Sequence, residues 1–479
     1  MPGLAARLLC LFLLDATAPG ATLGQQAPTP APPTLSEAER LYGLSLFWKE
    51  ADYSFPYFDQ LGGLDWDSAY TAFVPQVLRA SSACEYYRAL QRFAALLQDG
   101  HTSVTMPEAV LASCGFDVPW VTLREVRRRA IVANVGETLA NRIPIGSEVL
   151  AVDAVPVEDF LRAKVFPYIA HGTEHVRWDW GIRGNRYAPY GLLLGPAGSP
   201  ARLRIRTPGG EVREVEVVRD RAVRTDAWAR PIPAGGNVLE HREIEPGIDY
   251  VALNGFGNRR IVAEFEALLP ALRESCGVIL DLRGNSGGSL TTGKLILRHF
   301  VTDTLLGFVW QTREHRAAFK AWGRWAAEDP WARQYEDYAR GTAWHAGAPD
   351  TLFPAPGPRI EAPLVILTGH GTASAGEDLL VFLDGTRRAT LVGEPTNGSS
   401  GEPLFFDLPG GGSARIVSYR ETYPDGRRTL IDQGVQPDVL VELTMEDIRA
   451  GRDPVLETGI EVLRKSLRCA AGKGTGGRH

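Results

Sequence analysis

The sequence lacks several features that would mark a membrane, metal-binding or nucleic-acid-binding protein. After the N-terminal segment, no stretch approaches the about 18 uninterrupted apolar residues of a membrane-spanning helix. The 5 cysteines include no CxxC pair, which argues against a cysteine-bound zinc site. The net charge of −6 is spread without long runs, so there is no nucleic-acid footprint or polybasic membrane patch. We therefore expect a mature chain with no membrane span, metal, cofactor or nucleic-acid partner.

The N-terminus has the pattern of an export signal. Arg7 precedes the apolar run LLCLFLL, and the residues ATA at 16–18 supply a small-x-small cleavage site. These features predict a signal peptide over residues 1–24, cleaved near residue 18, and a proline-rich linker over residues 25–34. The mature protein is then expected to be exported, to a periplasmic or extracellular location.

Cysteine usage leaves the redox state of the chain open. Apart from Cys10 in the apolar run, the cysteines are Cys84, Cys114, Cys276 and Cys469. In an exported protein an even number permits disulfides, and proximity in sequence favours Cys84 with Cys114. Four buried free thiols are the alternative.

Helical patterns follow the linker. Ser36 with Glu39, and Ser82 with Glu85, each have the capping-box spacing of a helix start. After the second cap, apolar residues recur at helical spacing at Tyr86, Leu90, Phe93 and Leu97. The sequence predicts an N-terminal helical domain over residues 35–104.

Short strand patterns occupy residues 115–222, among them VPWVTL, RAIVANV, SEVLAV and EVREVEVV. The stretch IPIGSEVLAVDAVPVEDF resembles part of a PDZ domain, in which a glycine turn leads into a strand, a tight turn and a helix. We expect a PDZ-like β domain over residues 115–222, with residues 168–195 as an insertion.

From about residue 245, strand and helix patterns alternate. The strand patterns are YVALNGF, CGVILDL, APLVILTG and RATLVGE. This alternation predicts an α/β domain with a mainly parallel sheet over residues 223–470, followed by a disordered tail over residues 471–479. The tryptophan-rich residues 308–348 do not fit the alternation, and we interpret them as a local aromatic core or, alternatively, as a lid or wall of a substrate site.

Two strand-to-turn junctions are candidates for chemistry, because ligands in open α/β sheets bind at the carboxyl ends of strands. The first, DLRGNSGGSLTTGKL at 281–295, nearly matches a P-loop, but Leu295 stands where the Mg²⁺-binding hydroxyl belongs. The second is GHGTASAGE, where Ser374 lies between a buried strand and a helix N-terminus. A plain N-cap is the other interpretation of Ser374, and Thr372 breaks the GxSxG pattern of α/β-hydrolases.

A nucleophilic serine needs a general base. No lysine lies between Lys320 and Lys465, so a Ser-Lys pair is not favoured. His101, in LLQDGHTSV, follows a helix end and a glycine, so we expect it on a turn and not in a packed apolar face. His370, four residues before Ser374, is the alternative base.

Taken in order, DGHT, the PDZ-like segment, DLRGNSGG, TASAGE and DQGVQPD resemble the tail-specific, or C-terminal processing, protease family. The resemblance covers residues 36–465. Within the family, the sequence is similar to the branch that contains the tricorn protease core and interphotoreceptor retinoid-binding protein. In the other branch, the Ser-Lys branch, the segment after the nucleophile carries the catalytic lysine, and here that segment reads GEPTNGSSGEP, without a lysine. The resemblance implies a crotonase- or ClpP-like α/β catalytic domain.

The resemblance also implies catalytic roles. Ser374 is the nucleophile, His101 is the base, and Asp432, where glutamate is usual, is the acid that fixes the histidine tautomer. The branch can carry a serine immediately before the histidine, and Gly100 stands there instead, so that auxiliary contact is expected to be absent.

In the same family the glycine-rich loop and the residue after the nucleophile form an oxyanion hole. The resemblance therefore assigns the N–H groups of Gly287, with Gly288 close behind, and of Ala375 to this role. Glycines allow the close backbone approach that such a site needs. Asp281, Arg283 and Asn285 are expected to shape the loop.

The sequence thus predicts an exported serine peptidase that acts on unfolded or C-terminal polypeptide segments through a Ser-His-Asp triad. His101 and Ser374 lie far apart in the chain, so the helical domain must dock on the catalytic domain. One alternative is a non-catalytic ligand-binding protein on the same fold, as retinoid-binding relatives suggest. The other is an esterase that uses the same triad.

Overall fold

The computed structural model describes residues 31–467, except 186–188, 233–235 and 427. The predicted signal peptide, most of the predicted linker and the predicted tail lie outside these described residues. Within the described part, each helix is too short or too polar to serve as a membrane span.

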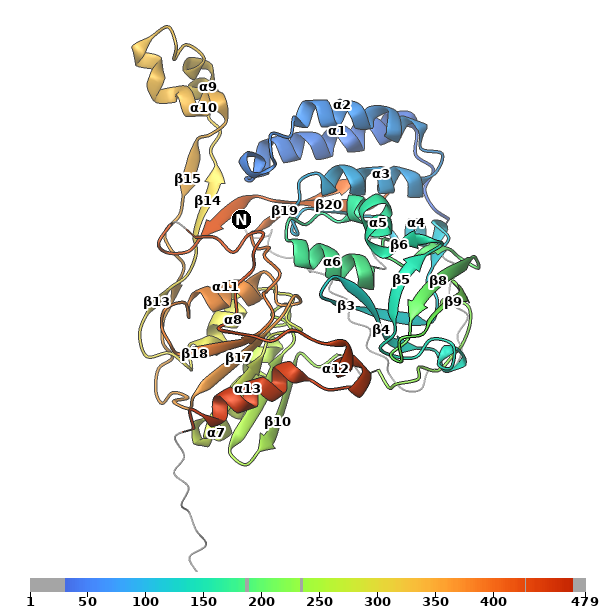
Figure 1. Ribbon diagram of the computed structural model, residues 1–479. Coiled ribbons are helices and arrows are strands. Elements are labelled where there is room, and N and C mark those ends of the chain that lie inside the picture. The colour runs from blue at the N-terminus through green and yellow to red at the C-terminus, as the bar shows by residue number, and fades with distance from the viewer. Residues whose placement is uncertain (1–30, 186–188, 233–235, 427, 468–479) are drawn as a thin grey trace, which may run out of the picture.

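Three helices form an N-terminal layer (Figure 1): α1 (Glu37–Ser54), α2 (Trp66–Arg79) and α3 (Ala83–Ala95). The capping predicted at α1 is present, because the Ser36 hydroxyl accepts from the N–H of Glu39 at 3.3 Å and the Glu39 carboxylate accepts from the N–H of Ser36 at 2.8 Å. Ser82 likewise accepts from the N–H of Glu85 at 3.2 Å. These contacts satisfy N–H groups that have no partner inside the helix.

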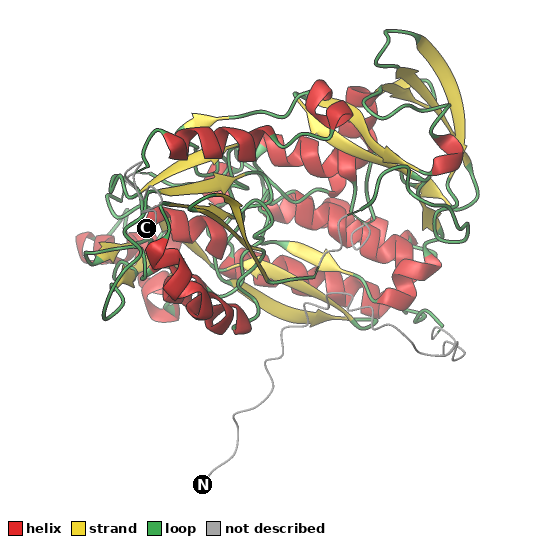
Figure 2. Ribbon diagram, turned by 90° about the horizontal axis from the view of Figure 1, so that it is seen from below, coloured by secondary structure: helices red, strands yellow, loops and turns green. Residues whose placement is uncertain are grey.

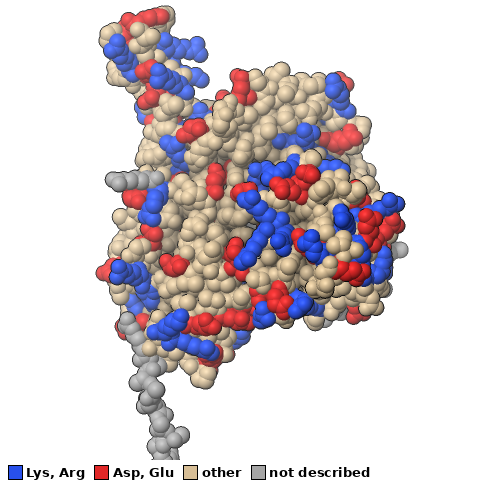
Figure 3. Space-filling model, viewed as in Figure 1, with Lys and Arg blue, Asp and Glu red and all other residues tan. Residues whose placement is uncertain are grey.

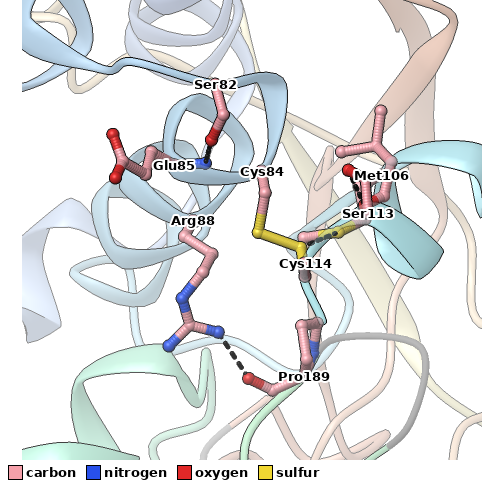
Figure 4. Close-up of a disulfide and its surroundings, with 9 residues drawn as sticks. Ser82, Cys84, Glu85, Arg88, Met106, Ser113, Cys114 and Pro189 are labelled. Carbon is pink, nitrogen blue, oxygen red and sulfur yellow. Dashed lines mark hydrogen bonds between the residues drawn. A yellow bond between two sulfur atoms is a disulfide. The ribbon is translucent and has the colours of Figure 1, made fainter. Parts of the chain in front are cut away.

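A disulfide joins α3 to the segment after α4 (Glu108–Ser113) through Cys84 and Cys114 (Figure 4). The sequence left this pair open between a disulfide and free thiols, and the structure contains the bridge. The loop that it closes, over a sequence separation of 30 residues, includes His101. Beside the bridge, Arg88 donates to the carbonyl of Pro189 at 2.6 Å.

Residues 121–218 form an antiparallel sheet with its own hydrophobic core, and we call this part the β region. Helix α6 (Glu174–Arg183) packs on the first strand of the sheet and lies within the segment predicted as an insertion. The strand order is β3-β4-β5-β8-β9, with β6 paired to β5. The strands are β3 (Val121–Val126), β4 (Arg129–Val135), β5 (Glu148–Val152), β6 (Val155–Pro156), β8 (Pro200–Arg206) and β9 (Val212–Val218).

The C-terminal half contains the predicted α/β sheet, in the order β10-β11-β12-β17-β18-β22. Strands β11 to β22 are parallel, and β10 is antiparallel at one edge. Figure 2 shows strands and helices interspersed through the molecule, as expected for a mixed α/β fold. The strands are β10 (Leu239–Glu245), β11 (Ile248–Leu253), β12 (Gly277–Asp281), β17 (Leu364–Thr368), β18 (Ala389–Gly393) and β22 (Val439–Leu440).

Helices cover both faces of this sheet. On β12, Val278 and Leu280 face one side, and Ile279 faces the other. Because both faces are buried, the strands read as continuous apolar runs in the sequence. The first face carries α7 (Arg260–Glu274), α8 (Leu290–Leu297) and α11 (Ala375–Val381), and the second carries α13 (Pro454–Arg464).

The N-terminal helices and the α/β region share one hydrophobic core. Strand β1 (Ser103–Thr105) pairs antiparallel with β20 (Gly412–Val417), which pairs with β19 (Pro403–Leu408). The N-terminal helical layer is therefore docked on the α/β region, as predicted from the distance in sequence between His101 and Ser374. This docking brings the chain after α3 to the α/β region.

The tryptophan-rich segment forms an arm that projects from the body (Figure 1). Its stem pairs β14 (Val309–Arg313) with β15 (Trp344–Ala346), and its tip holds α9 (Ala317–Gly323) and α10 (Glu336–Arg340). At the tip, Phe319, Trp322, Trp331 and Tyr335 contact one another through their rings, which agrees with the predicted local aromatic core. The core is open, because Trp331 is 52% exposed.

Candidate active site

Ser374 lies where strand β17 passes into helix α11. Its backbone has φ +53° and ψ −129°, a conformation that non-glycine residues rarely adopt. The N–H of Ser374 donates to Glu377 Oε2 at 3.1 Å and to the carbonyl of Ser399 at 3.2 Å. Backbone strain held by such bonds is a common property of functional sites.

His101 reaches this serine from the loop between α3 and β1. Its Nε2 lies 3.0 Å from Ser374 Oγ. The loop is held by Asp99 Oδ1, which accepts from the N–H of His101 and the hydroxyl of Thr102, both at 2.9 Å. Arg415 on β20 donates to the carbonyl of Gly100 at 3.0 Å. The predicted pair of nucleophile and base is therefore brought together.

Burial sets the charge of the imidazole. The His101 side chain is 9% exposed, and desolvation lowers its pKa to about 3. Arg415 and His171 lower the pKa further through their charges. The imidazole is therefore neutral at pH 7, the form that can accept a proton from a serine hydroxyl.

The other imidazole nitrogen contacts a residue that the sequence did not assign. His101 Nδ1 lies 2.7 Å from the hydroxyl of Ser399. The structure does not bring Asp432 to this position: no hydrogen bond joins its carboxylate to His101 among the described residues, and its side chain is exposed to solvent beside Gly172. An aspartate is one methylene shorter than the glutamate usual here, which reduces its reach.

The hydroxyl of Ser399 occupies the space beside Gly100, where a serine before the histidine would place its own side chain. A Cβ on Gly100 would lie 2.7 Å from Ser399 Oγ and 2.7 Å from His171 Cδ2. The expected absence of a hydroxyl next to the histidine is therefore corrected. Ser399 supplies one, and it fills the volume that a side chain at residue 100 would take.

The glycine-rich loop lies against the nucleophile. Gly287 has φ +98°, and a Cβ there would lie 2.6 Å from Ser374 Cβ and 3.1 Å from the nitrogen of Ala375. Glycine is required by both the backbone conformation and the close approach. The structure therefore brings Gly287 close to both Ser374 and Ala375.

The predicted oxyanion donor at Gly287 is already engaged. Its N–H donates to Asn285 Oδ1 at 3.0 Å, and Asn285 Nδ2 donates to the carbonyl of Leu253 at 2.9 Å. The N–H groups of Gly288 and Ala375 make no hydrogen bond to any described residue. Asparagine often bonds the backbone two residues later, so the motif itself contained this signal.

Glu377 is a second residue at this site, after Ser399, that the sequence reasoning did not assign. This carboxylate is fully buried and accepts from Thr396 Oγ1 at 2.5 Å and from the N–H groups of Gly398 at 2.7 Å, Ser399 at 3.2 Å and Ser374 at 3.1 Å. Burial raises the pKa of Glu377 to about 7, whereas the four donors favour its ionised form. A glutamate three residues after an N-cap serine was the available signal.

His370, the alternative base, makes no hydrogen bond to Ser374 among the described residues, and His101 holds that place. Its ring is tilted against that of His175, with the centroids 4.5 Å apart, and His370 lines a cavity of ≈ 330 Å³ at the carboxyl ends of β12, β17 and β18. Arg124 and Glu394 also line this cavity, which lies between the β region and the α/β sheet. Charged side chains of both signs are likewise interspersed over the face shown in Figure 3.

The described residues contain no cluster of three or more His, Cys, Asp or Glu side chains arranged for a metal ion. Ser374 Oγ lies at hydrogen-bond distance from a neutral imidazole, and the N–H of the next residue, Ala375, makes no hydrogen bond to a described residue. Such a site can form and break an acyl-enzyme.

Comparison with known proteins identifies relatives of this chain. Residues 247–441 match the model of peptidase family S41. The chain is 28% identical over 251 residues to carboxyl-terminal-processing peptidase 2, chloroplastic, of Arabidopsis thaliana. The matched residues make up 52% of this chain and 41% of that protein. This chain is 24% identical over 283 residues to the carboxyl-terminal-processing protease of Synechocystis sp., which covers 58% and 56%. The chain thus spans about half the length of the curated relatives it matches.

A solved structure extends the similarity of the fold to almost the whole chain. Mature CPAF in complex with lactacystin superposes with a TM-score of 0.65 at 16% identity, covering 90% of this chain and 98% of that one. At this identity the match supports the fold alone. The helical layer, the β region and the α/β region are therefore parts of one known architecture.

Proposed function

We propose that the chain is an exported serine peptidase that hydrolyses peptide bonds in unfolded or C-terminal polypeptide segments. The premise is the match of residues 247–441 to the model of peptidase family S41. The observation that carries the proposal is the contact of 3.0 Å between Ser374 Oγ and His101 Nε2, across 273 residues of sequence. A neutral imidazole at hydrogen-bond distance from a strained serine is what general-base activation requires.

The reaction follows from these atoms. His101 Nε2 takes the hydroxyl proton while Ser374 Oγ attacks the carbonyl carbon of the substrate. The proton then passes to the leaving amine as the peptide bond breaks, and a water molecule hydrolyses the acyl-enzyme by the reverse use of the same base. No other group is required to accept or supply a proton.

The N–H groups of Ala375 and Gly288 hold the negative charge on the carbonyl oxygen in this proposal. Neither N–H makes a hydrogen bond to a described residue, and each follows directly on Ser374 or on Gly287, the glycine that approaches Ser374, whereas the N–H of Gly287 is bonded to Asn285. Preorganised donors of this kind contribute roughly 3 kcal/mol each to transition-state stabilisation. Gly287 contributes by leaving room for the close approach.

The substrate class rests on the β region and on the relatives. Several relatives are carboxyl-terminal-processing proteases by name. We assign a PDZ-like domain to residues 115–222, between a helical domain over 35–104 and a protease domain over 223–470. A PDZ-like domain binds an extended chain by adding it to a sheet edge. The cavity of ≈ 330 Å³ at the junction of the β region and the α/β sheet supports a role in presenting substrate.

Export is supported by the disulfide between Cys84 and Cys114. Disulfides persist in oxidising compartments such as the periplasm and the extracellular space. The bridge stabilises the loop that carries the base, so a reducing compartment would weaken the part of the molecule that catalysis needs.

A labelling experiment tests the proposed function. The purified chain is treated with a fluorophosphonate probe, and Ser374→Ala is the control. We expect labelling of Ser374 together with hydrolysis of casein, both lost in Ser374→Ala. Labelling with ester but not peptide hydrolysis would indicate an esterase. No labelling would contradict a hydrolase and favour a ligand-binding protein.

A further inference from the structure

The base of the proposed reaction is held at its far side by a serine and not by an acid. We propose that Ser399 is a positioning residue of the active site: its hydroxyl accepts the Nδ1 proton of His101 and thereby fixes the tautomer in which Nε2 faces Ser374. This inference rests on the proposed function, and it gives Ser399 the role that the sequence assigned to Asp432.

The tautomer matters because the two nitrogens of a neutral imidazole have opposite roles. One carries a proton and donates, and the other accepts. If Nδ1 donates to Ser399 Oγ over 2.7 Å, the lone pair of Nε2 is left to accept the proton of Ser374 over 3.0 Å. The reverse tautomer would leave the nucleophile without a base.

Water cannot easily substitute for this contact. Ser399 is 2% exposed and His101 is 9% exposed, so an Nδ1–H without a protein acceptor would be largely desolvated and unpaired. His171, itself 1% exposed, closes the same space near Gly100. The hydroxyl of Ser399 is therefore the acceptor that the site provides.

The backbone of Ser399 is fixed relative to the nucleophile. Its carbonyl accepts from the N–H of Ser374 at 3.2 Å, and its own N–H donates to Glu377 Oε2 at 3.2 Å. The N–H of Ser374 donates to the same carboxylate oxygen at 3.1 Å. The imidazole of His101 thus lies between two serine hydroxyls whose backbones are bonded to each other and to one buried carboxylate. This arrangement fixes the histidine at both nitrogens.

Ser400 offers a matched control, because it is the next residue, is 1% exposed and also carries a hydroxyl that makes a hydrogen bond. Its Oγ donates to Asp378 Oδ1 at 2.6 Å and does not contact His101. Ser399→Ala and Ser400→Ala therefore each remove one buried hydroxyl from the same loop. Only the first removes the contact with the imidazole.

The test measures the rate at which a fluorophosphonate labels Ser374 in the full chain, as a function of pH. We expect Ser399→Ala to lower the rate about tenfold or more, and its pH midpoint to move lower by about half a unit, because the imidazolium loses an acceptor. Ser400→Ala should leave the midpoint unchanged. Ser399→Cys, in which a thiol is only a weak acceptor, should show a smaller loss in the same direction and covers the case in which Ser399→Ala does not fold.

Each other outcome has a defined meaning. If wild-type Ser374 is labelled and the Ser399 variants keep its rate and pH midpoint within about twofold, the role of Ser399 is refuted and the proposed function stands. Equal losses in the Ser399 and Ser400 variants with an unmoved midpoint would also refute it, since the loop and not the imidazole contact would then be responsible. An unlabelled wild type would overturn the proposed function, and this inference with it.

Discussion

The helical layer and the α/β region are fused by one hydrophobic core, whereas the β region has a core of its own. The base and the nucleophile both lie on the fused part. The β region meets that part through polar contacts, among them His171 Nε2 with Asn397 Oδ1 at 2.7 Å, and a small apolar cluster of Val126, Ile131 and Ile448. From this difference we expect the chemistry at Ser374 to depend more on the fused core than on the core of the β region. Four experiments can break or sharpen this comparison.

The largest effect is expected within the fused part, at the catalytic pair. Ser374→Ala or His101→Ala should each lower peptide hydrolysis by on the order of 10⁴ or more, because members of such a pair act as a unit. Asp432→Asn should change the rate by less than about threefold, since the exposed carboxylate makes no bond to His101. Turnover of a peptide substrate measures both. A loss in Asp432→Asn as large as in His101→Ala would show that Asp432 reaches the imidazole during catalysis.

Core truncations test the separation directly. Phe93 is fully buried in the fused core and stacks on Trp66, with the ring centroids 4.3 Å apart. Phe93→Ala should destabilise the chain by about 3–5 kcal/mol and abolish labelling of Ser374. Leu203→Ala, equally buried in the β region, should cost about 2–5 kcal/mol yet leave labelling of Ser374 intact under folding conditions. Urea unfolding and fluorophosphonate labelling measure the two quantities. Loss of labelling in both variants at matched stability would mean that the two parts are coupled.

Sequence reasoning recovered the strands of the α/β sheet because both faces are buried and the apolar runs are continuous. It also brought forward Ser374, at a strand end, and His101, at a helix end, as a candidate pair, and the structure places the two side chains in contact. Ser399 had no such signal. It lies in a loop of glycines and serines, and its contact with His101 joins residues 298 apart, created only when β1 pairs with β20. Contacts of that kind depend on docking, which local patterns do not encode.

The next largest effect is expected from removing the disulfide between Cys84 and Cys114. Replacing Cys84 and Cys114 together with serine should lower the free energy of unfolding by about 3.5 kcal/mol, because the bridge closes a loop with a sequence separation of 30 residues. Since that loop contains His101, we expect the loss of peptidase activity on heating to occur at a lower temperature. Thermal unfolding under non-reducing conditions measures the change. An unchanged midpoint would show that the hydrophobic core alone fixes the base.

The smallest effect is expected at the polar junction with the β region, and it depends on pH. Burial lowers the pKa of His171 to about 4 in the folded chain, whereas an unfolded histidine has a pKa of about 6.5. Between these two pH values the imidazole is neutral in the folded chain and protonated in the unfolded chain. His171 therefore contributes stability at neutral pH that is lost as the pH falls through this window, on the order of 2 kcal/mol by pH 5. His171→Gln, which retains a donor for Asn397, should flatten the acid side of the stability curve. Parallel slopes for wild type and variant between pH 7 and pH 5 would show that this contact does not report on the junction.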